Sequence, residues 1–266
     1  MAHSDFEALI QFAERLADAA REAIAPHFRS GAAPTNKSAQ NFDPVTAGDV
    51  AAEEVMRALI TSFRPHDGIV GEEFDDLPSR SGLTWVLDPI DGTRAFVAGL
   101  ASWTTLIGVL DETGVPIIGL IDQSVLGERY IGWPGGAALI TPKGRTPLNV
   151  SECADLRTAV ISTTDPFILT PSEQGAWTHL RDTARITRYG LDAYAYARLS
   201  AGSIDLVAES NLESYDAAAL IPVVRGAGGL ACDWTGAPAM PGGQLVCAAT
   251  QDLLDDALIA LRRSAA

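Results

Sequence analysis

The sequence has 266 residues, of which 47% are hydrophobic, and its 34 acidic and 19 basic side chains give a formal net charge of −15. That length allows one large domain or two small ones with a substantial core. The acidic balance argues against nonspecific nucleic-acid binding, which requires clustered Lys and Arg. No run of about 18 apolar residues is present, so we expect no membrane span.

The cellular compartment follows from the cysteines and the N-terminus. Cys153, Cys232 and Cys247 form no CxxC pattern, which predicts buried free thiols in a reducing environment. The residues through Glu7 are acidic and lack the basic-then-apolar order of a signal peptide. We therefore expect a soluble, cytoplasmic protein.

The first half of the chain predicts helices followed by an antiparallel meander. Apolar residues at spacings of three and four indicate an amphipathic helix over 5–28 and a second one ending near Phe63, with Thr46 or Asp49 as its cap. A polar loop at 31–41, carrying Lys37, separates them, and we expect it to close over the site when metal and substrate bind. Short strands are then predicted at 69–70, 85–87, 103–110, 115–122, 126–133 and 137–141.

The second half alternates between strands and helices. Strands are predicted at 159–162, 185–187, 204–208, 230–233 and 245–248, and helices at 172–182, 192–201, 215–226 and 253–262. The polar segment 142–152 divides the chain into subdomains 1–145 and 146–266 of one compact unit. The prediction is an α+β fold of layered helices and sheets, antiparallel in the first half and mixed in the second.

Two carboxylates at the end of a predicted strand form the central candidate site. Asp88 follows Trp85-Val86-Leu87, and Asp91 follows three residues later, before Gly92 and Thr93. Paired carboxylates at a buried position repel each other unless a cation lies between them, and oxygen ligands without Cys or His suit Mg²⁺. Gly92 and Thr93 would offer backbone N–H groups to a phosphate. The alternative is that Asp-Pro-x-Asp-Gly is a simple turn.

Further acidic residues stand at the ends of predicted elements: Asp43, Glu72 and Asp216. Each has an alternative structural interpretation. Asp216 could serve the dipole of its helix, and Glu72 could be a solvated loop charge. His3, His27, His66 and His179 lie outside every motif, so we interpret them as surface or turn residues.

In this order, Gly-Glu-Glu, Asp-Pro-Ile-Asp-Gly-Thr and Tyr-Asp-Ala-Ala resemble the inositol monophosphatase superfamily of Mg²⁺-dependent phosphatases, over nearly the whole chain. The resemblance implies the layered α-β-α-β-α sugar-phosphatase fold and a site with two or three Mg²⁺ ions. It implies metal ligation by Glu72, Asp88, Asp91, Asp216 and the carbonyl of Ile90. It also implies that Asp43 and Thr93 orient the water, and that phosphate is held by Gly92 and Thr93.

The residues around these motifs are similar to the histidinol-phosphate phosphatase branch of the superfamily. Arg94 follows the central motif, and Asp192 and Glu209 could accompany a cationic amine or imidazole of the substrate, with Asp91 and Asp216 beside it. The alternatives are a helix N-cap for Asp192 and a surface charge at a strand end for Glu209. That branch often has Gly and Cys where this chain has Leu191 and Ala193.

The resemblance leads to a substrate hypothesis with alternatives. It implies a histidinol-phosphatase of histidine biosynthesis that acts as a homodimer on a small-molecule phosphate ester, without nucleic-acid or membrane partners. Inositol 1-phosphate, fructose 1,6-bisphosphate and 3′-phosphoadenosine 5′-phosphate are alternative substrates. A regulatory binding protein on the same fold is the non-enzyme alternative.

Overall fold

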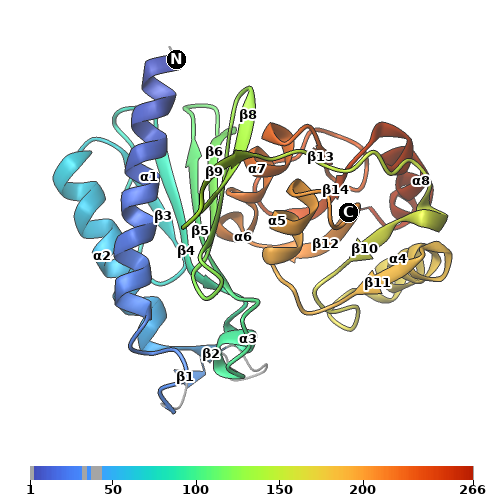
Figure 1. Cartoon of the computed structure of the whole chain (residues 1–266), viewed down its shortest axis with the longest axis horizontal. Helices are drawn as coiled ribbons and strands as arrows, with labels where there is room; N and C mark the ends of the chain where they lie inside the picture. Colours follow the sequence, from blue (N-terminus) through green and yellow to red (C-terminus); the bar gives the residue numbers. More distant parts are fainter. Residues whose placement is uncertain (1–2, 32–34, 37–43, 266) are drawn as a thin grey trace.

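The computed structural model describes residues 3–31, 35–36 and 44–265, which form five layers (Figure 1). Helices α1 (His3–Ile24) and α2 (Ala47–Phe63) cover the outer face of a seven-stranded sheet. A middle layer of short helices separates this sheet from a five-stranded sheet, whose other face carries α4 and α8. The predicted layered α+β fold is confirmed.

The seven-stranded sheet has the order β3-β4-β5-β6-β7-β8-β9. The meander from β4 to β9 is antiparallel as predicted, but β3 runs parallel to β4, so the sheet is mixed. The polar connection before β4 is long enough to return the chain to the start of the next strand. The strands are β3 (Gly68–Gly71), β4 (Thr84–Asp91), β5 (Thr104–Leu110), β6 (Pro116–Gln123), β7 (Glu128–Trp133), β8 (Gly136–Thr141) and β9 (Gly144–Pro147).

Helix α1 packs on this sheet through apolar side chains and one ionic contact. Leu9, Ala13 and Leu16 are buried, as their helical spacing predicts. Asp122 of β6 accepts hydrogen bonds from Arg21 of α1 at 2.8 Å and from Arg129 of β7 at 2.7 Å. The fully buried Asp122 carboxylate is thereby neutralised by two guanidinium groups.

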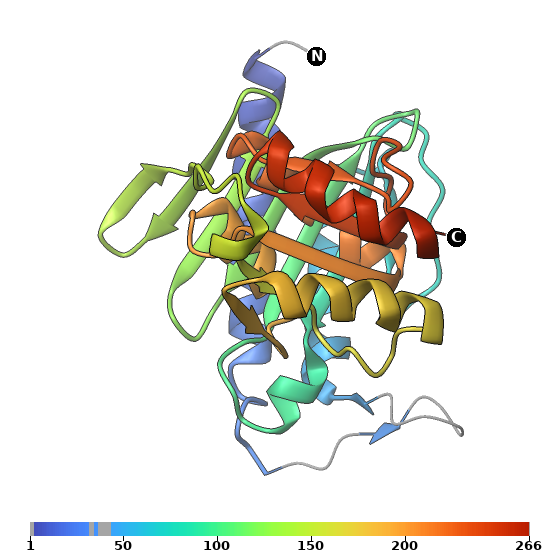
Figure 2. The ribbon, with the colours of Figure 1, turned by 90° about the vertical axis from the view of Figure 1, so that its right-hand side faces the viewer.

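The second sheet has the order β11-β10-β12-β14-β13 and combines parallel and antiparallel pairs, as predicted. Helices α4 and α8 lie side by side over its outer face (Figure 2). The elements are η1 (Leu156–Thr158), β10 (Val160–Ser162), α4 (Pro171–Thr183), β11 (Ile186–Arg188), α5 (Tyr194–Ser200), β12 (Leu206–Leu212), β13 (Leu230–Cys232), β14 (Gly243–Ala248), α8 (Gln251–Leu261) and η2 (Arg262–Ser264).

Some small elements differ from the sequence prediction. The segment expected to be a loop at 31–41 contains β1 (Thr35–Asn36), which pairs with β2 (Pro44–Val45). The predicted boundary segment contains β9, and a helix α3 (Thr93–Val97) follows β4. Elements of two to five residues are too short for hydrophobic periodicity to reveal them.

The helix predicted over 215–226 is wrong as a single element. It is divided into α6 (Ser214–Ala217) and α7 (Leu220–Gly226), with a turn at Ala218 and Ala219. Pro222 has no N–H with which to bond the carbonyl four residues earlier, that of Ala218, which favours a break there. This divided segment forms the middle layer together with α5.

A row of glycines on the seven-stranded sheet lets the divided segment approach closely. Gly108, Gly119 and Gly132 are paired neighbours on β5, β6 and β7. A Cβ added to Gly119 would lie 2.0 Å from the carbonyl oxygen of Ala219, and one added to Gly132 would lie 2.3 Å from that of Pro222. No larger residue fits at either position without backbone movement.

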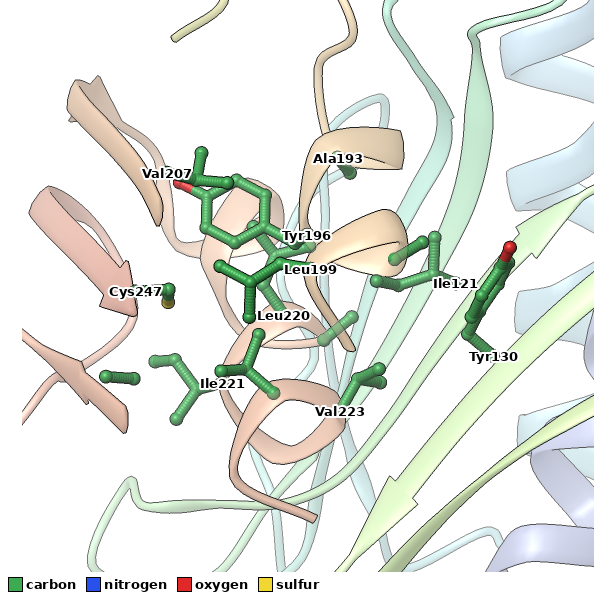
Figure 3. Close-up of a cluster of buried hydrophobic side chains, with 14 of the residues drawn as sticks. Ile121, Tyr130, Ala193, Tyr196, Leu199, Val207, Leu220, Ile221, Val223 and Cys247 are labelled. Atoms are coloured by element: carbon green, nitrogen blue, oxygen red, sulfur yellow. The ribbon is translucent and has the colours of Figure 1, made fainter. Parts of the chain in front are cut away.

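The two halves share a hydrophobic cluster, part of which is drawn in Figure 3. Ile121 and Tyr130 of the first sheet pack in one cluster with Val207 and Cys247 of the second, through Leu220 of α7. The division proposed at 145–146 falls within β9. We therefore propose that subdomains 1–145 and 146–266 form one compact unit.

Gly119→Ala should destabilise the protein by about 3 kcal/mol, because the added methyl group overlaps the Ala219 carbonyl. Gly175→Ala in α4 is the matched control, since a Cβ there meets nothing within 4 Å; we expect it to be neutral or to stabilise by up to about 1 kcal/mol. Urea unfolding of both variants measures the difference. Equal stability of the two would contradict the role of the glycine row.

Candidate active site

A bulge in β4 places the two central aspartates together. Asp88 pairs with Leu106 of β5 and Asp91 pairs with Thr104, so two residues of β4 lie opposite Thr105. In a regular strand, residues three apart point to opposite faces, and one extra residue restores them to the same face. Pro89, which lacks an N–H, stands within this irregular segment, and its carbonyl accepts a hydrogen bond from Thr105 Oγ1 at 2.7 Å.

Asp216 joins the pair from the other half of the chain. Ligand oxygens of Asp88, Asp91 and Asp216 all lie within 4.8 Å of one another. Asp216 also accepts a hydrogen bond from the backbone N–H of Glu213 at 2.7 Å, as part of a capping box at the start of α6. The Asp216 carboxylate therefore both caps the start of α6 and belongs to the carboxylate cluster.

The cluster has the donor chemistry of a hard-cation site. Asp88 is 2% exposed, and its Oδ1 has no hydrogen-bond partner among the described residues. A buried carboxylate oxygen without a partner is costly. Because the grouped ligands are all oxygens, a Mg²⁺ ion would fit them. The simple-turn interpretation of this stretch does not account for the buried orphan oxygen.

Glu72 and Asp49 contribute charge to the same region. Glu72 directly follows β3, and the buried Glu53 carboxylate fixes this loop by accepting the Glu73 N–H at 2.8 Å. Asp49 is 1% exposed and accepts hydrogen bonds from the N–H and the hydroxyl of Thr46, the N-cap of α2. From the sequence, Asp49 was predicted only as a possible cap of this helix. Its position six residues after Asp43, before an apolar helix, was the signal that could have identified it.

The carboxylates hold one another's pKa values high. Burial and then the charge of Glu72 raise the pKa of Asp88 well above its usual value. Burial and the charge of Asp192 do the same for Asp91. Burial raises the pKa of Asp216 to about 7 and that of Asp49 to about 6, with Glu72 adding to both. A bound cation would reverse these shifts because it favours the ionised forms.

The start of α3 adjoins the cluster. Gly92 is the N-cap of α3 with φ +81°, a backbone conformation that favours glycine, and a Cβ there would crowd Asp192 Oδ2 at 3.0 Å. Thr93 Oγ1 donates a hydrogen bond to the Ile90 carbonyl at 3.0 Å. The hydroxyl oxygen of Thr93 keeps its capacity to accept a hydrogen bond.

An acidic cavity of about 180 Å³ opens beside the cluster. Asp91, Asp192, Glu209 and Asp216 all line it, and its described lining residues include no Lys, Arg or His. Glu209 is 3% exposed inside β12, so its interpretation as a surface charge at a strand end is wrong. Strand β12 continues four residues beyond its predicted end at 208.

Hydrogen bonds fix Glu209, one of the acids that face this cavity from the second half of the chain. Glu209 Oε1 accepts from the N–H and the hydroxyl of Thr164, at 2.8 and 2.9 Å. Burial nevertheless raises the pKa of Glu209 to about 8. Asp192 does not cap α5, whose N-cap is Ala193, and it adopts φ +49°. Backbone strain at a non-glycine residue is typical of functional positions.

Asp192 lines both this cavity and an outer one of about 610 Å³, and Arg94 lines the outer one. Burial raises the pKa of Asp192 to about 6, and the positive charge of Arg94 opposes that rise. Leu100 and Phe167, which are 57% and 86% exposed, line the outer cavity. The backbone N–H of Ala193 donates to Asp91 Oδ2 at 2.7 Å, which joins the cavity to the carboxylate cluster.

The remaining predicted residues are placed as follows. Asp43 and Lys37 lie outside the described residues, so their roles stay predictions. His66 and His179 are exposed and His27 is half-buried in a turn. The three cysteines are free, but Cys153 is only half-buried, which corrects the expectation that all are buried. Among the described residues, no helix has the length and apolar character needed to cross a membrane.

Known proteins share this fold. An inositol monophosphatase from Zymomonas mobilis superposes with a TM-score of 0.84 at 38% identity, covering 96% of this chain and 98% of that one. The profile of the inositol monophosphatase family matches residues 5–266. The chain belongs to the inositol monophosphatase family.

Several of the sequence relatives are phosphatases. A histidinol-phosphatase from Mycobacterium tuberculosis is 35% identical over 223 residues, which is 82% of this chain and 84% of that protein. A histidinol-phosphatase from Streptomyces coelicolor is 30% identical over 263 residues, 94% and 95% of the two chains. The chloroplastic bifunctional phosphatase IMPL2 of Arabidopsis thaliana is 40% identical, and the chain spans 63% of its length. Family and relatives together make this chain a phosphoric monoester hydrolase.

The raised pKa values predict how stability depends on pH. The metal-free folded protein binds more protons than the unfolded chain at pH values between the ordinary carboxylate pKa and the raised ones, about 6 for Asp49 and about 7 for Asp216. Its stability should therefore fall as pH rises from about 5 to about 8, and Mg²⁺ should restore it at the upper end. Thermal melting in EDTA and in Mg²⁺ measures both effects. A melting temperature that Mg²⁺ leaves unchanged at the higher pH would contradict the site.

Proposed function

We propose that this protein is a Mg²⁺-dependent phosphomonoesterase that hydrolyses L-histidinol phosphate to L-histidinol and phosphate, in histidine biosynthesis. The observation that carries the proposal is the acidic cavity directly beside the carboxylate cluster. The cluster suits a metal-assisted phosphate transfer, and the cavity suits a cationic leaving group. The histidinol-phosphatase relatives support the same substrate.

In this proposal Glu72, Asp88, Asp91, Asp216 and the Ile90 carbonyl hold the metal. The Ile90 carbonyl has a second lone pair available beside the hydrogen bond from Thr93. When bound, Mg²⁺ would supply electrostatic stabilisation of the charge on the phosphoryl group and on the leaving oxygen. The protein's own contribution is to hold its carboxylates in place before the metal arrives.

Backbone and hydroxyl groups at the start of α3 would handle the phosphate and the water. The N–H groups of Gly92 and Thr93 are proposed to bind phosphate oxygens. Thr93 donates its hydrogen to Ile90, so its oxygen can accept a hydrogen bond from the attacking water and orient it. Asp43 is proposed to share this task, and buried Asp49 is a further candidate because its charge raises the pKa of Asp88.

The organic part of the substrate would occupy the acidic cavity. Metal ions would neutralise Asp91 and Asp216, which leaves Asp192 and Glu209 to accompany a positive charge. Two buried carboxylates offset the desolvation of an ammonium or imidazolium group. Arg94 stands beside Asp192 and would limit how much positive charge the cavity accepts.

Inositol 1-phosphate is the second candidate substrate, because the related inositol monophosphatase from Zymomonas mobilis is 38% identical. Inositol is a neutral polyol and needs no net negative cavity. Comparing phosphate release from both esters decides between them. Faster turnover of inositol 1-phosphate would overturn the proposed substrate.

We also propose that the protein is cytoplasmic and acts as a homodimer. Three free cysteines fit a reducing compartment. The exposed side chains of Leu100 and Phe167 at the outer cavity are apolar surface of the kind that subunit contacts cover. Light scattering on the purified protein measures the oligomeric state.

Asp88→Asn should lower phosphate release by about 100-fold or more, because loss of even an outer partner of a metal ligand costs about 10- to 100-fold and Asp88 is proposed as a direct ligand. Without metal, the variant should be at least as stable as the unaltered protein, since it removes a buried charge whose Oδ1 has no partner among the described residues. Glu54→Gln on the exposed side of α2 is the matched control and should change neither property. Normal turnover by the Asp88 variant would refute the metal assignment.

Glu209→Gln should lower kcat/KM for L-histidinol phosphate by about 10-fold or more, because an amide offers no charge to a cationic leaving group. The effect on inositol 1-phosphate should be smaller. Glu152→Gln, an exposed residue outside the cavity, is the control. Steady-state kinetics on both esters measure the ratio, and equal losses on the two would argue against a role in selecting charge.

A further inference from the structure

Tyr196 of α5 lines the acidic cavity, and neither the motifs nor the proposed metal site uses it. Its side chain is 1% exposed. The ring extends from α5 toward Val207 of β12, as Figure 3 shows. Glu209 follows Val207 on the same face of that strand, since the two are separated by one residue. Tyr196 therefore lies on the side of the cavity formed by Glu209.

The Tyr196 hydroxyl has no hydrogen-bond partner among the residues that the structure describes. A buried phenol normally finds one, because an unmade hydrogen bond in the interior is costly. Burial and the charge of Glu209 raise its pKa well above the usual value, so the hydroxyl keeps its proton. It is a donor whose hydrogen is unused.

The other hydroxyl groups that line the cavity already donate hydrogen bonds to protein carboxylates. Thr164 donates its hydroxyl hydrogen to Glu209 at 2.9 Å, and Ser210 donates to Glu173 at 2.5 Å. The remaining polar side chains facing the cavity are chiefly carboxylates, which accept hydrogen bonds. Among the described lining residues, Tyr196 therefore supplies a hydroxyl hydrogen-bond donor in a cavity whose other polar side chains are mostly acceptors.

We propose that Tyr196 is a specificity-determining residue whose hydroxyl donates a hydrogen bond to an acceptor atom on the organic part of the substrate. The inference rests on the proposed function and deepens it. A neutral imidazole carries one N–H and one nitrogen lone pair. Glu209 and Asp192 would accept hydrogen bonds from the ammonium group and the ring N–H, and Tyr196 would donate to the other ring nitrogen. In this proposal the cavity selects a ligand with one cationic donor, one neutral N–H donor and one acceptor.

Tyr196→Phe tests this inference because it removes only the hydroxyl. We expect kcat/KM for L-histidinol phosphate to fall roughly 3- to 10-fold. The change should be mainly in KM, because the hydrogen bond from Tyr196 forms in the substrate complex as well as in the transition state. Phenyl phosphate, whose leaving group has no ring acceptor or cation, should be hydrolysed within about 2-fold of the unaltered rate. The melting temperature should stay the same or rise, since an unsatisfied hydroxyl is removed.

Tyr130→Phe is the matched control. The Tyr130 hydroxyl donates to Glu128 at 2.6 Å and accepts from Arg198 at 3.0 Å, outside the cavity lining. Its loss should lower the melting temperature and leave the ratio of the two substrates unchanged. A lower melting temperature for Tyr196→Phe, with equal losses on both substrates, would show a structural role and overturn the inference.

The outcome also separates this inference from the substrate proposal. If the unaltered enzyme prefers L-histidinol phosphate and Tyr196→Phe leaves its kcat/KM unchanged, the inference fails and the proposed function stands. If the unaltered enzyme prefers inositol 1-phosphate, the proposed function fails. In that case the hydroxyls of inositol can also accept a hydrogen bond from Tyr196. A fall in kcat/KM of Tyr196→Phe on inositol 1-phosphate but not on phenyl phosphate would then support the role of Tyr196. An unchanged kcat/KM on inositol 1-phosphate would overturn the inference.

Discussion

The carbonyl of Ala219 rests against the bare backbone of Gly119, and this close approach fixes the relation between the two halves of the molecule. The residues just before it form α6, which carries Asp216. Because the sheet presents glycines at this point, Asp216 reaches Asp88 and Asp91 across the interface. A side chain on the glycine row would separate the halves and move one ligand away from the other two. The grouping of the three carboxylates thus depends on glycines of the sheet that are not themselves part of the site.

Charge repulsion is the second constraint on the structure. The cluster and the adjoining cavity concentrate carboxylates in a buried region, where each raises the pKa of its neighbours. Protons relieve this repulsion in the metal-free protein, and divalent cations with a positively charged leaving group would relieve it in the working enzyme. The proposed metal affinity and the proposed preference for a cationic substrate would therefore be two consequences of one electrostatic arrangement.

Much of the architecture is visible in the sequence, because α1 and the meander of the first sheet follow clear hydrophobic periods. The grouping of Asp88, Asp91 and Asp216 was implied by the resemblance to the inositol monophosphatase superfamily, since each acid alone also had a structural interpretation. Three features were not predictable. The burial of Glu209 depends on strand β12 continuing past Ala208 into polar residues. The close approach of Ala219 to Gly119 depends on tertiary packing, although Pro222 already favours a break between α6 and α7. The Tyr196 hydroxyl has no partner among the described residues because its neighbours already form hydrogen bonds with other groups, which no local sequence pattern predicts.

The bulge in β4 has a consequence for how such sites are inherited. If the spacing of three residues were kept and the pairing with β5 became regular, one of the two carboxylates would turn to the opposite face of the sheet. Substitutions at the two intervening positions are therefore tolerable only as long as the backbone stays irregular. Pro89 favours this irregularity because it has no N–H to donate to a neighbouring strand. Across diverging sequences, residues that disfavour regular pairing should persist between the two acids even where their identity changes.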